Sequence, residues 1–171
     1  MIVAWAHGCK AIGHRSTGHR SLAASLCWER CSVCLVRIIE ATTVEQVEAA
    51  APLYDDPPVR PATNAFLADP RHHLLVALDD DGRTLGFISG VEMTHPDKGT
   101  EMFLYELAVA EHARRQGIGL ALTASLADLA RSQGCYGMWV GVDTDNAAAH
   151  ATYRAAGGNK PEPCDVITWT F

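Results

Sequence analysis

The residues from Arg114 to Ala121 have the composition and spacing of a phosphate-binding loop. They follow an apolar, strand-like run from Phe103 to Val109 and open a long helical pattern. A helix that begins directly after such a strand points unpaired backbone N–H groups and the positive end of its dipole at an anion. The residues expected to hold phosphates are Arg114, Arg115, Gln116, Gly117, Ile118, Gly119, Leu120 and Ala121.

The loop differs from the two commonest nucleotide-binding signatures, so it indicates another phosphate ligand. It lacks the G-x-x-x-x-G-K-S/T pattern, and Leu122 stands where G-x-G-x-x-G needs its third glycine. A second motif follows the loop after a helical stretch and an apolar, strand-like run. It reads Asn146-x-x-Ala149-x-x-x-Tyr153-x-x-x-Gly157.

Together the two motifs resemble the acetyl-CoA-binding signatures of the GCN5-related N-acetyltransferases (GNAT). The run Tyr105-Glu106-Leu107-Ala108-Val109, with the loop after it, is most similar to the aminoglycoside 3-N-acetyltransferases. The resemblance covers about residues 36–171. It implies a single α/β domain whose mixed, mostly antiparallel β-sheet is flanked by helices. It also implies acetyl-CoA as co-substrate, no metal, and acetylation of an aminoglycoside amine, expected at the 3-amino group, which would confer resistance to the antibiotic.

The resemblance also implies roles around acetyl-CoA. The N–H group of Val109 would bind the acetyl carbonyl oxygen, and the main chain of Leu107 and Val109 would hold the pantetheine arm where two strands part. Asn146 and Ala149 belong to the same cofactor-binding set, and Asn146 is also suited to cap a helix. Tyr153 would donate a proton to the departing thiolate, although a tyrosine on an apolar helix face is also a common core residue.

Glu106 is the candidate general base. It interrupts the apolar run from Phe103 to Val109, where a buried strand would prefer a hydrophobic residue, and an unpaired buried carboxylate costs free energy. The resemblance implies that it accepts the proton of the acceptor amine, directly or through a water. The alternative is a solvent-facing edge position with no role.

Further acidic residues suggest a site for a cationic acceptor. Asp143 and Asp145 follow an expected strand, and with Glu106 they would present three carboxylates to ammonium groups. The same stretch also has the composition of an ordinary turn and helix cap. Tyr105 is expected either to line this site or to turn into the core.

Charge favours a small cationic partner and argues against nucleic acid. The formal net charge is −6. The first 34 residues carry four basic side chains and one acidic one, so the remainder carries −9. No apolar run approaches the ~20 residues of a membrane span. We therefore expect a cytoplasmic protein that binds a small cationic substrate, has no nucleic-acid or membrane partner, and could form a homodimer.

Residues 1–34 are expected to be a poorly ordered extension, and 35–171 the acetyltransferase domain. The extension lacks sustained periodicity and holds four of the six cysteines, Cys9, Cys27, Cys31 and Cys34, at spacings irregular for zinc. No metal site is therefore expected. Cys135 and Cys164 lie in apolar surroundings typical of the core.

The candidate site residues must be positioned by strands and helices that alternate along the chain. Apolar alternation predicts strands over 34–40, 73–78, 84–93, 102–109, 135–142 and 166–171. Helical patterns cover 43–53, 60–67, the stretch from the glycine loop to about 132, and 146–156, and Thr43 with Gln46 forms a capping box. The pattern predicts an α/β sandwich around one mixed sheet.

Two other functions are consistent with the sequence. The acceptor could be a peptide, a protein N-terminus, a lysine or a polyamine, because acceptor-binding loops vary more than the coenzyme half. The chain could also be a non-catalytic acetyl-CoA-binding module. The presence of both Glu106 and Tyr153 favours an enzyme.

Overall fold

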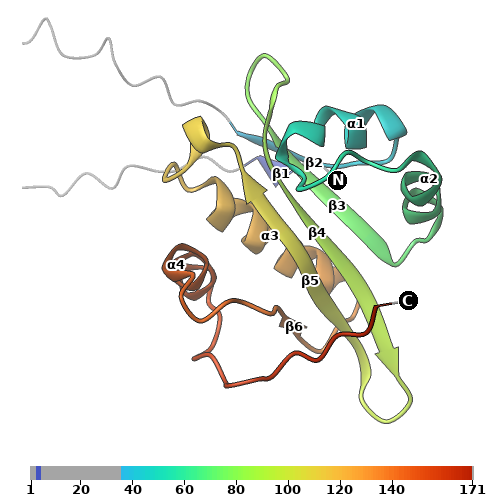
Figure 1. Ribbon diagram of the computed structural model, residues 1–171, viewed down its shortest axis with the longest axis vertical. Helices are drawn as coiled ribbons and strands as arrows, with labels where there is room; N and C mark the ends of the chain where they lie inside the picture. Colours follow the sequence, from blue (N-terminus) through green and yellow to red (C-terminus); the bar gives the residue numbers. More distant parts are fainter. Residues whose placement is uncertain (1–2, 5–35, 171) are drawn as a thin grey trace, which may run out of the picture.

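The structure is a computed structural model that describes residues 3–4 and 36–170, and its strands form one six-stranded sheet (Figure 1). The strands lie in sequence order: β1 (Val3–Ala4), β2 (Arg37–Glu40), β3 (His72–Leu78), β4 (Thr84–His95), β5 (Gly99–Val109) and β6 (Met138–Trp139). Neighbours from β1 to β5 are antiparallel, whereas β6 runs parallel to β5. The predicted mixed, mostly antiparallel sheet is confirmed.

Helices cover both faces of this sheet. They are α1 (Val44–Ala49), α2 (Arg60–Ala68), α3 (Ile118–Ser132) and α4 (Ala147–Ala155), with 3₁₀ turns at Ala51–Leu53 and Glu111–Ala113. Phe87 of β4 packs with α1 and α2 on one face, and the next residue, Ile88, packs with α3 on the other. Alternate residues of β4 are thus buried on opposite faces, as the two-residue period of a strand requires. Tyr153 of α4 packs against the α3 side.

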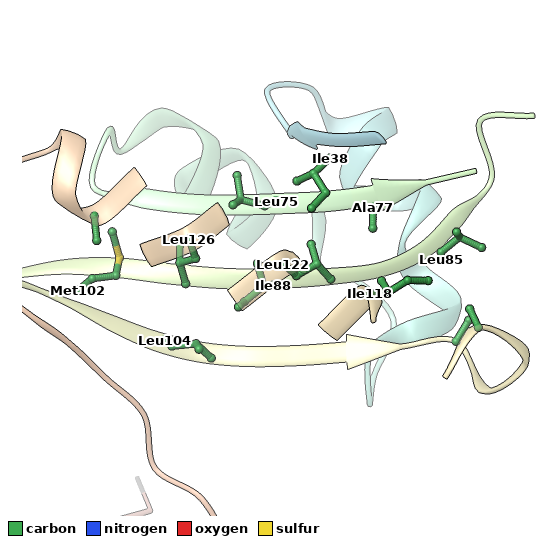
Figure 2. Packing of buried hydrophobic residues seen from close by; sticks show 13 residues of the cluster. Ile38, Leu75, Ala77, Leu85, Ile88, Met102, Leu104, Ile118, Leu122 and Leu126 are labelled. Carbon is green, nitrogen blue, oxygen red and sulfur yellow. The ribbon is translucent and has the colours of Figure 1, made fainter. Parts of the chain in front are cut away.

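The larger hydrophobic cluster lies between α3 and the sheet (Figure 2). Leu122 and Leu126 of α3 are fully buried against Ile88 and Met102 of the central strands. Gly90 lies directly beneath α3. A Cβ atom there would come within 2.8 Å of Met102 Sδ and 2.9 Å of Leu126 Cδ1, so a side chain at this position would force these two buried side chains to repack.

Local signals in the sequence specify several boundaries. The predicted capping box is present at α1: Gln46 N–H donates to Thr43 Oγ1 (3.4 Å), and Thr43 N–H donates to Gln46 Oε1 (3.1 Å). The β3–β4 turn contains Gly82 at φ +80°, a left-handed conformation that favours glycine. Asn146 caps α4 by accepting a hydrogen bond from Ala149 N–H at 3.0 Å. These caps were predictable because each depends on residues within four positions.

Two strand predictions were wrong. The strand expected over 135–142 is reduced to β6, because only Met138 and Trp139 pair with β5 before the chain turns toward α4. Of the terminal strand expected over 166–171, the described residues 166–170 form neither strand nor helix, and their side chains are exposed. A strand forms only when it pairs with a neighbour, and residues 166–170 pair with none of the described strands.

The two cysteines described differ in their surroundings. Cys135 packs against the larger cluster as predicted, but Cys164 is exposed, so its assignment to the core was wrong. The cysteines of the N-terminal extension lie outside the described residues, as does most of that extension apart from β1. Among the described helices, none is long and apolar enough to cross a membrane.

Leu126→Ala should test the packing of α3 on the sheet. The substitution removes a fully buried side chain, so we expect the free energy of unfolding to fall by about 2–5 kcal/mol in urea denaturation. Val59→Ala, at an exposed position, should change it by less than about 0.5 kcal/mol. Similar small losses in both variants would contradict the packing described.

Candidate functional site

A β-bulge in β5 determines which face of the sheet carries Glu106. Ser89 pairs with Glu106, but the adjacent Gly90 pairs with Leu104, so Tyr105 is an extra residue without a partner on β4. Met102 and Leu104 are buried beneath α3. Without the bulge, Glu106 would continue this alternation and point at α3. The extra residue turns it to the opposite face, where α1 and α2 lie.

The surroundings of Glu106 make its carboxyl group harder to ionise than a free glutamate. Glu106 is half-buried, and this burial raises the pKa of its carboxyl group, with a further contribution from the negative charge of Asp55. Burial and the charge of Glu106 raise the pKa of Tyr54 to about 12. The ring of Tyr54 packs on Phe87 with its centroid at 4.5 Å, which fixes this side of the site.

Tyr54 and Asp55 were missed from the sequence. They follow the 3₁₀ turn at Ala51–Leu53 and lie about fifty positions before Glu106, so no local pattern connects them. The only signal was a tyrosine beside two aspartates immediately before Pro57-Pro58.

Beyond the bulge, β5 has an open edge. In the described chain β6 pairs with β5 only at Met102 and Phe103, as the predicted parting of these strands requires. Ala110 N–H donates to Leu85 O (2.9 Å), toward β4. Because backbone groups of successive strand residues point to opposite sides, those of Val109 and Leu107 point to the open edge. Arg114 Nε donates to Val109 O there at 3.1 Å.

The predicted phosphate loop lies at the end of this open edge and leads into α3. Arg115 and Gly117 have positive φ values of 61° and 83°. The first bond of α3 runs from Ala121 N–H to Gly117 O at 2.9 Å, so the N–H groups of the preceding turn have no partner within the helix. Arg114, Arg115 and Gln116 are exposed around this turn.

Other loop residues serve packing. The side chain of Ile118 is buried in the core, which leaves only its main chain for a ligand. Leu120 and Ala121 are half-buried. A Cβ at Gly119 would lie 3.4 Å from Thr152 Cγ2 of α4 and 3.7 Å from Val109 Cγ2. Gly119 therefore lets α3 approach α4 and β5, which is a packing role in addition to the predicted one.

Helix α4 brings the second motif beside the loop. Thr152 lies next to Gly119, and its neighbour Tyr153 is half-buried against the larger cluster. Burial raises the pKa of the Tyr153 hydroxyl. The N–H group of Ala149 is occupied by the Asn146 cap, so the amide NH₂ of Asn146 and the methyl group of Ala149 remain for contact with a ligand.

The other predicted acceptor residues are exposed, Tyr105 on β5 and the two aspartates in the turn before α4. Tyr105 is 70% exposed, so it does not turn into the core. Asp143 and Asp145 are exposed in the turn before α4, where His150 Nε2 lies 3.2 Å from the carbonyl oxygen of Asp143. The carboxylate that acts on Glu106 is that of Asp55. No group of His, Cys, Asp and Glu among the described residues is arranged to hold a metal ion.

A protein-family model matches most of this chain. The model described as "Acetyltransferase (GNAT) family" matches residues 35–157. No curated protein sequence matches significantly.

Solved structures share the fold at low sequence identity. The aminoglycoside acetyltransferase meta-AAC0020 from an uncultured soil metagenomic sample, in complex with trehalose, is 18% identical with a TM-score of 0.71, covering 80% of this chain and 96% of its own. AAC(6′)-Iy in complex with the bisubstrate analogue CoA-S-monomethyl-acetylneamine is 16% identical (TM-score 0.67, 78% and 98% covered). The 6′-N-acetyltransferase AAC(6′)-Ih from Acinetobacter baumannii is also 16% identical (TM-score 0.66, 80% and 99% covered).

Asp55→Asn should lower the pKa of Glu106, because it removes a negative charge that disfavours ionisation of the Glu106 carboxyl group. The pKa should stay above the usual glutamate value, since burial is the larger cause. A ¹³C NMR titration of the Glu106 carboxyl carbon measures the change. Asp56→Asn, next along the chain, should leave this pKa unchanged. Equal shifts in the two variants would show that Asp55 is not the specific partner.

Proposed function

The chain belongs to the acetyltransferase (GNAT) family and is an acetyl-CoA-dependent N-acetyltransferase, and we propose that its acceptor is an amine of an aminoglycoside. The observation that carries this proposal is the position of Glu106. The bulge turns this half-buried carboxylate to the face of α1 and α2, beside the open edge of β5, where the charge of Asp55 acts on it. Two neighbouring carboxylates favour a cationic ligand over a neutral or anionic one.

We propose that acetyl-CoA binds along the open edge of β5 and at the N-terminus of α3. The unpaired N–H groups between Gly117 and Leu120 would bind the pyrophosphate, with the exposed side chains of Arg114 and Arg115 adding positive charge. The main-chain groups of Leu107 and Val109 would hold the pantetheine arm as a strand-like partner. Gln116, Ile118, Gly119 and Ala121 would shape the loop, and Asn146 and Ala149 would border the arm from α4.

The proposed chemistry requires a base, an oxyanion donor and an acid. Acetyl-CoA supplies an activated acetyl thioester. Glu106 would take a proton from the acceptor ammonium, leaving a neutral amine to attack the acetyl carbonyl carbon. The N–H group of Val109 would stabilise the negative charge that develops on the carbonyl oxygen. Tyr153 would protonate the departing thiolate, and the second proton lost by the attached nitrogen would restore the tyrosine hydroxyl, so that the amide and free coenzyme A leave the site.

The acidic surroundings support an aminoglycoside as acceptor. Asp55 adds negative charge near Glu106, and Asp143 and Asp145 would add more at the mouth of the site. The sequence resemblance favours the 3-amino group, and two of the similar structures are described as AAC(6′) enzymes. We propose 3-N-acetylation and, with it, resistance to the antibiotic. NMR spectroscopy of the product distinguishes the 3-amino from the 6′-amino group.

A thiol-release assay across acceptors tests the proposed function. Sisomicin and gentamicin should support coenzyme A release, and the KM for the drug should rise as salt screens the carboxylates. Release with spermidine or a peptide, but with no aminoglycoside, would overturn the acceptor assignment and leave the acetyltransferase assignment in place.

Glu106→Gln should lower kcat by about 100-fold or more, because the amide cannot accept the proton of the amine. Binding of coenzyme A, measured by calorimetry, should be unchanged. The matched control is Glu101→Gln on the same strand, where the carboxylate accepts a hydrogen bond from the Tyr136 hydroxyl at 2.6 Å. Wild-type turnover in Glu106→Gln would show that another group or bulk water takes the proton.

Gly117→Asp should abolish detectable binding of acetyl-CoA, because it places a negative charge where the pyrophosphate is expected and strains a residue at φ +83°. Gly82→Asp controls for the backbone strain, since Gly82 has φ +80° and lies in the β3–β4 turn. Calorimetry should report near wild-type affinity for the control. Equal affinities in both variants would contradict the loop assignment.

A further inference from the structure

Three aromatic side chains form a surface beside Glu106 that packing of the core does not explain. They are Phe103 and Tyr105 of β5 and Trp139 of β6, and we call them the aromatic ledge. The rings of Phe103 and Trp139 lie 4.4 Å apart at an interplanar angle of 33°, and the ring of Tyr105 meets that of Phe103 edge-on at 5.9 Å. Tyr105 is 70% exposed and Trp139 is 45% exposed.

The ledge lies on the same side of the sheet as Glu106. Phe103 alternates with Met102 and Leu104, which are buried beneath α3, so its ring is on the opposite face. Tyr105 contacts Phe103 and therefore shares that face. Glu106 is turned to the same face by the bulge, because Tyr105 is the extra residue that precedes it. The bulge thus places an exposed aromatic ring and a carboxylate side by side.

The helices on this face pack over other strands. The buried cluster beneath α1 and α2 contains Leu74, Val76 and Leu78 of β3 and Phe87 of β4. The ledge is on β5 and β6, on the side of Glu106 away from this cluster. Exposed aromatic rings with adjacent carboxylates are suited to a ligand that has both apolar ring faces and positive charge.

An amino sugar has this combination. Its axial C–H groups form an apolar face that stacks on an aromatic ring, and its ammonium groups interact with the faces of tyrosine and tryptophan and with carboxylates. A peptide main chain or a phosphate-rich ligand would leave either the rings or the carboxylates without a partner. The charge of Glu106 and Asp55 therefore selects, among ligands that stack on aromatic rings, a cationic one.

We propose that the aromatic ledge is the subsite that holds the sugar rings of the acceptor, while Glu106 receives the proton of the reacting amine. This inference rests on the proposed function. Stacking on Tyr105 and Trp139 orients the rings, and the carboxylates supply the attraction for charge. Tyr105 and Trp139 are then specificity-determining residues that affect KM for the acceptor.

Steady-state kinetics with sisomicin at saturating acetyl-CoA test this proposal on the full chain. Tyr105→Ala and Trp139→Ala should each raise the KM for sisomicin by about 2- to 30-fold, the range typical of cation–π contacts, with kcat changed less than about twofold. Tyr105→Phe keeps the ring and should restore a KM close to that of the wild type. Tyr136→Ala, which also removes an exposed aromatic ring but near the β4–β5 turn, should leave both constants unchanged.

The salt dependence of KM distinguishes the contribution of ring stacking from that of the carboxylate charges. Raising the sodium chloride concentration should leave the ratio of variant to wild-type KM nearly constant for Tyr105→Ala, because ring stacking is not screened, whereas the ratio for Asp55→Asn should fall toward one.

An unchanged KM in both alanine variants overturns the ledge while the proposed function stands. A second result would also overturn the ledge: sedimentation shows that the wild type is a dimer and that Trp139→Ala is a monomer. A second copy of the chain, and not a sugar, would then cover the rings. If the wild type acetylates no aminoglycoside, the proposed function itself fails, and the ledge assignment with it.

Discussion

The register of β5 against β4 is the constraint on which the site depends. Up to Leu104 the strand pairs regularly and buries alternate residues beneath α3. One unpaired residue, Tyr105, then reverses the alternation, so that Glu106 faces α1 and α2 while Leu107 and Val109 pack against the α3 side. Without this reversal the carboxylate would lie in the apolar core beneath α3. The bulge therefore serves the fold and the proposed chemistry together.

The packing of α3 connects this register to the phosphate loop. Gly90, at the position where the register shifts, allows Leu126 to lie directly on the sheet, and Gly119 allows the first turn of the helix to approach β5 and α4. These contacts hold the N-terminus of α3 at the end of the open β5 edge. Burial and the charge of Asp55 both disfavour ionisation of Glu106. The ionised Glu106 is therefore less stable in the empty site than it would be beside a bound cation. A cationic acceptor would offset this cost.

The sequence predicted those features that depend on neighbouring residues. The α1 capping box, the Gly82 turn, the Asn146 cap and the glycine loop before α3 were all recognisable, since each is encoded within a few positions. The bulge was not predictable, because register is a property of two strands. The effect of the Asp55 charge on Glu106 joins distant segments and was missed for the same reason. The terminal strand prediction was wrong because strand propensity in Val166 and Ile167 does not make a strand unless the segment pairs with a neighbour, and 166–170 pairs with none of the described strands.

The most direct test of the account is a crystal structure of the chain with coenzyme A and sisomicin bound together. We expect the pyrophosphate on the N–H groups at the start of α3, and an acceptor amine nitrogen about 2.6–3.2 Å from a Glu106 carboxylate oxygen or connected to it through one water. An acceptor bound against Asp143 and Asp145, with no amine within reach of Glu106, would contradict it.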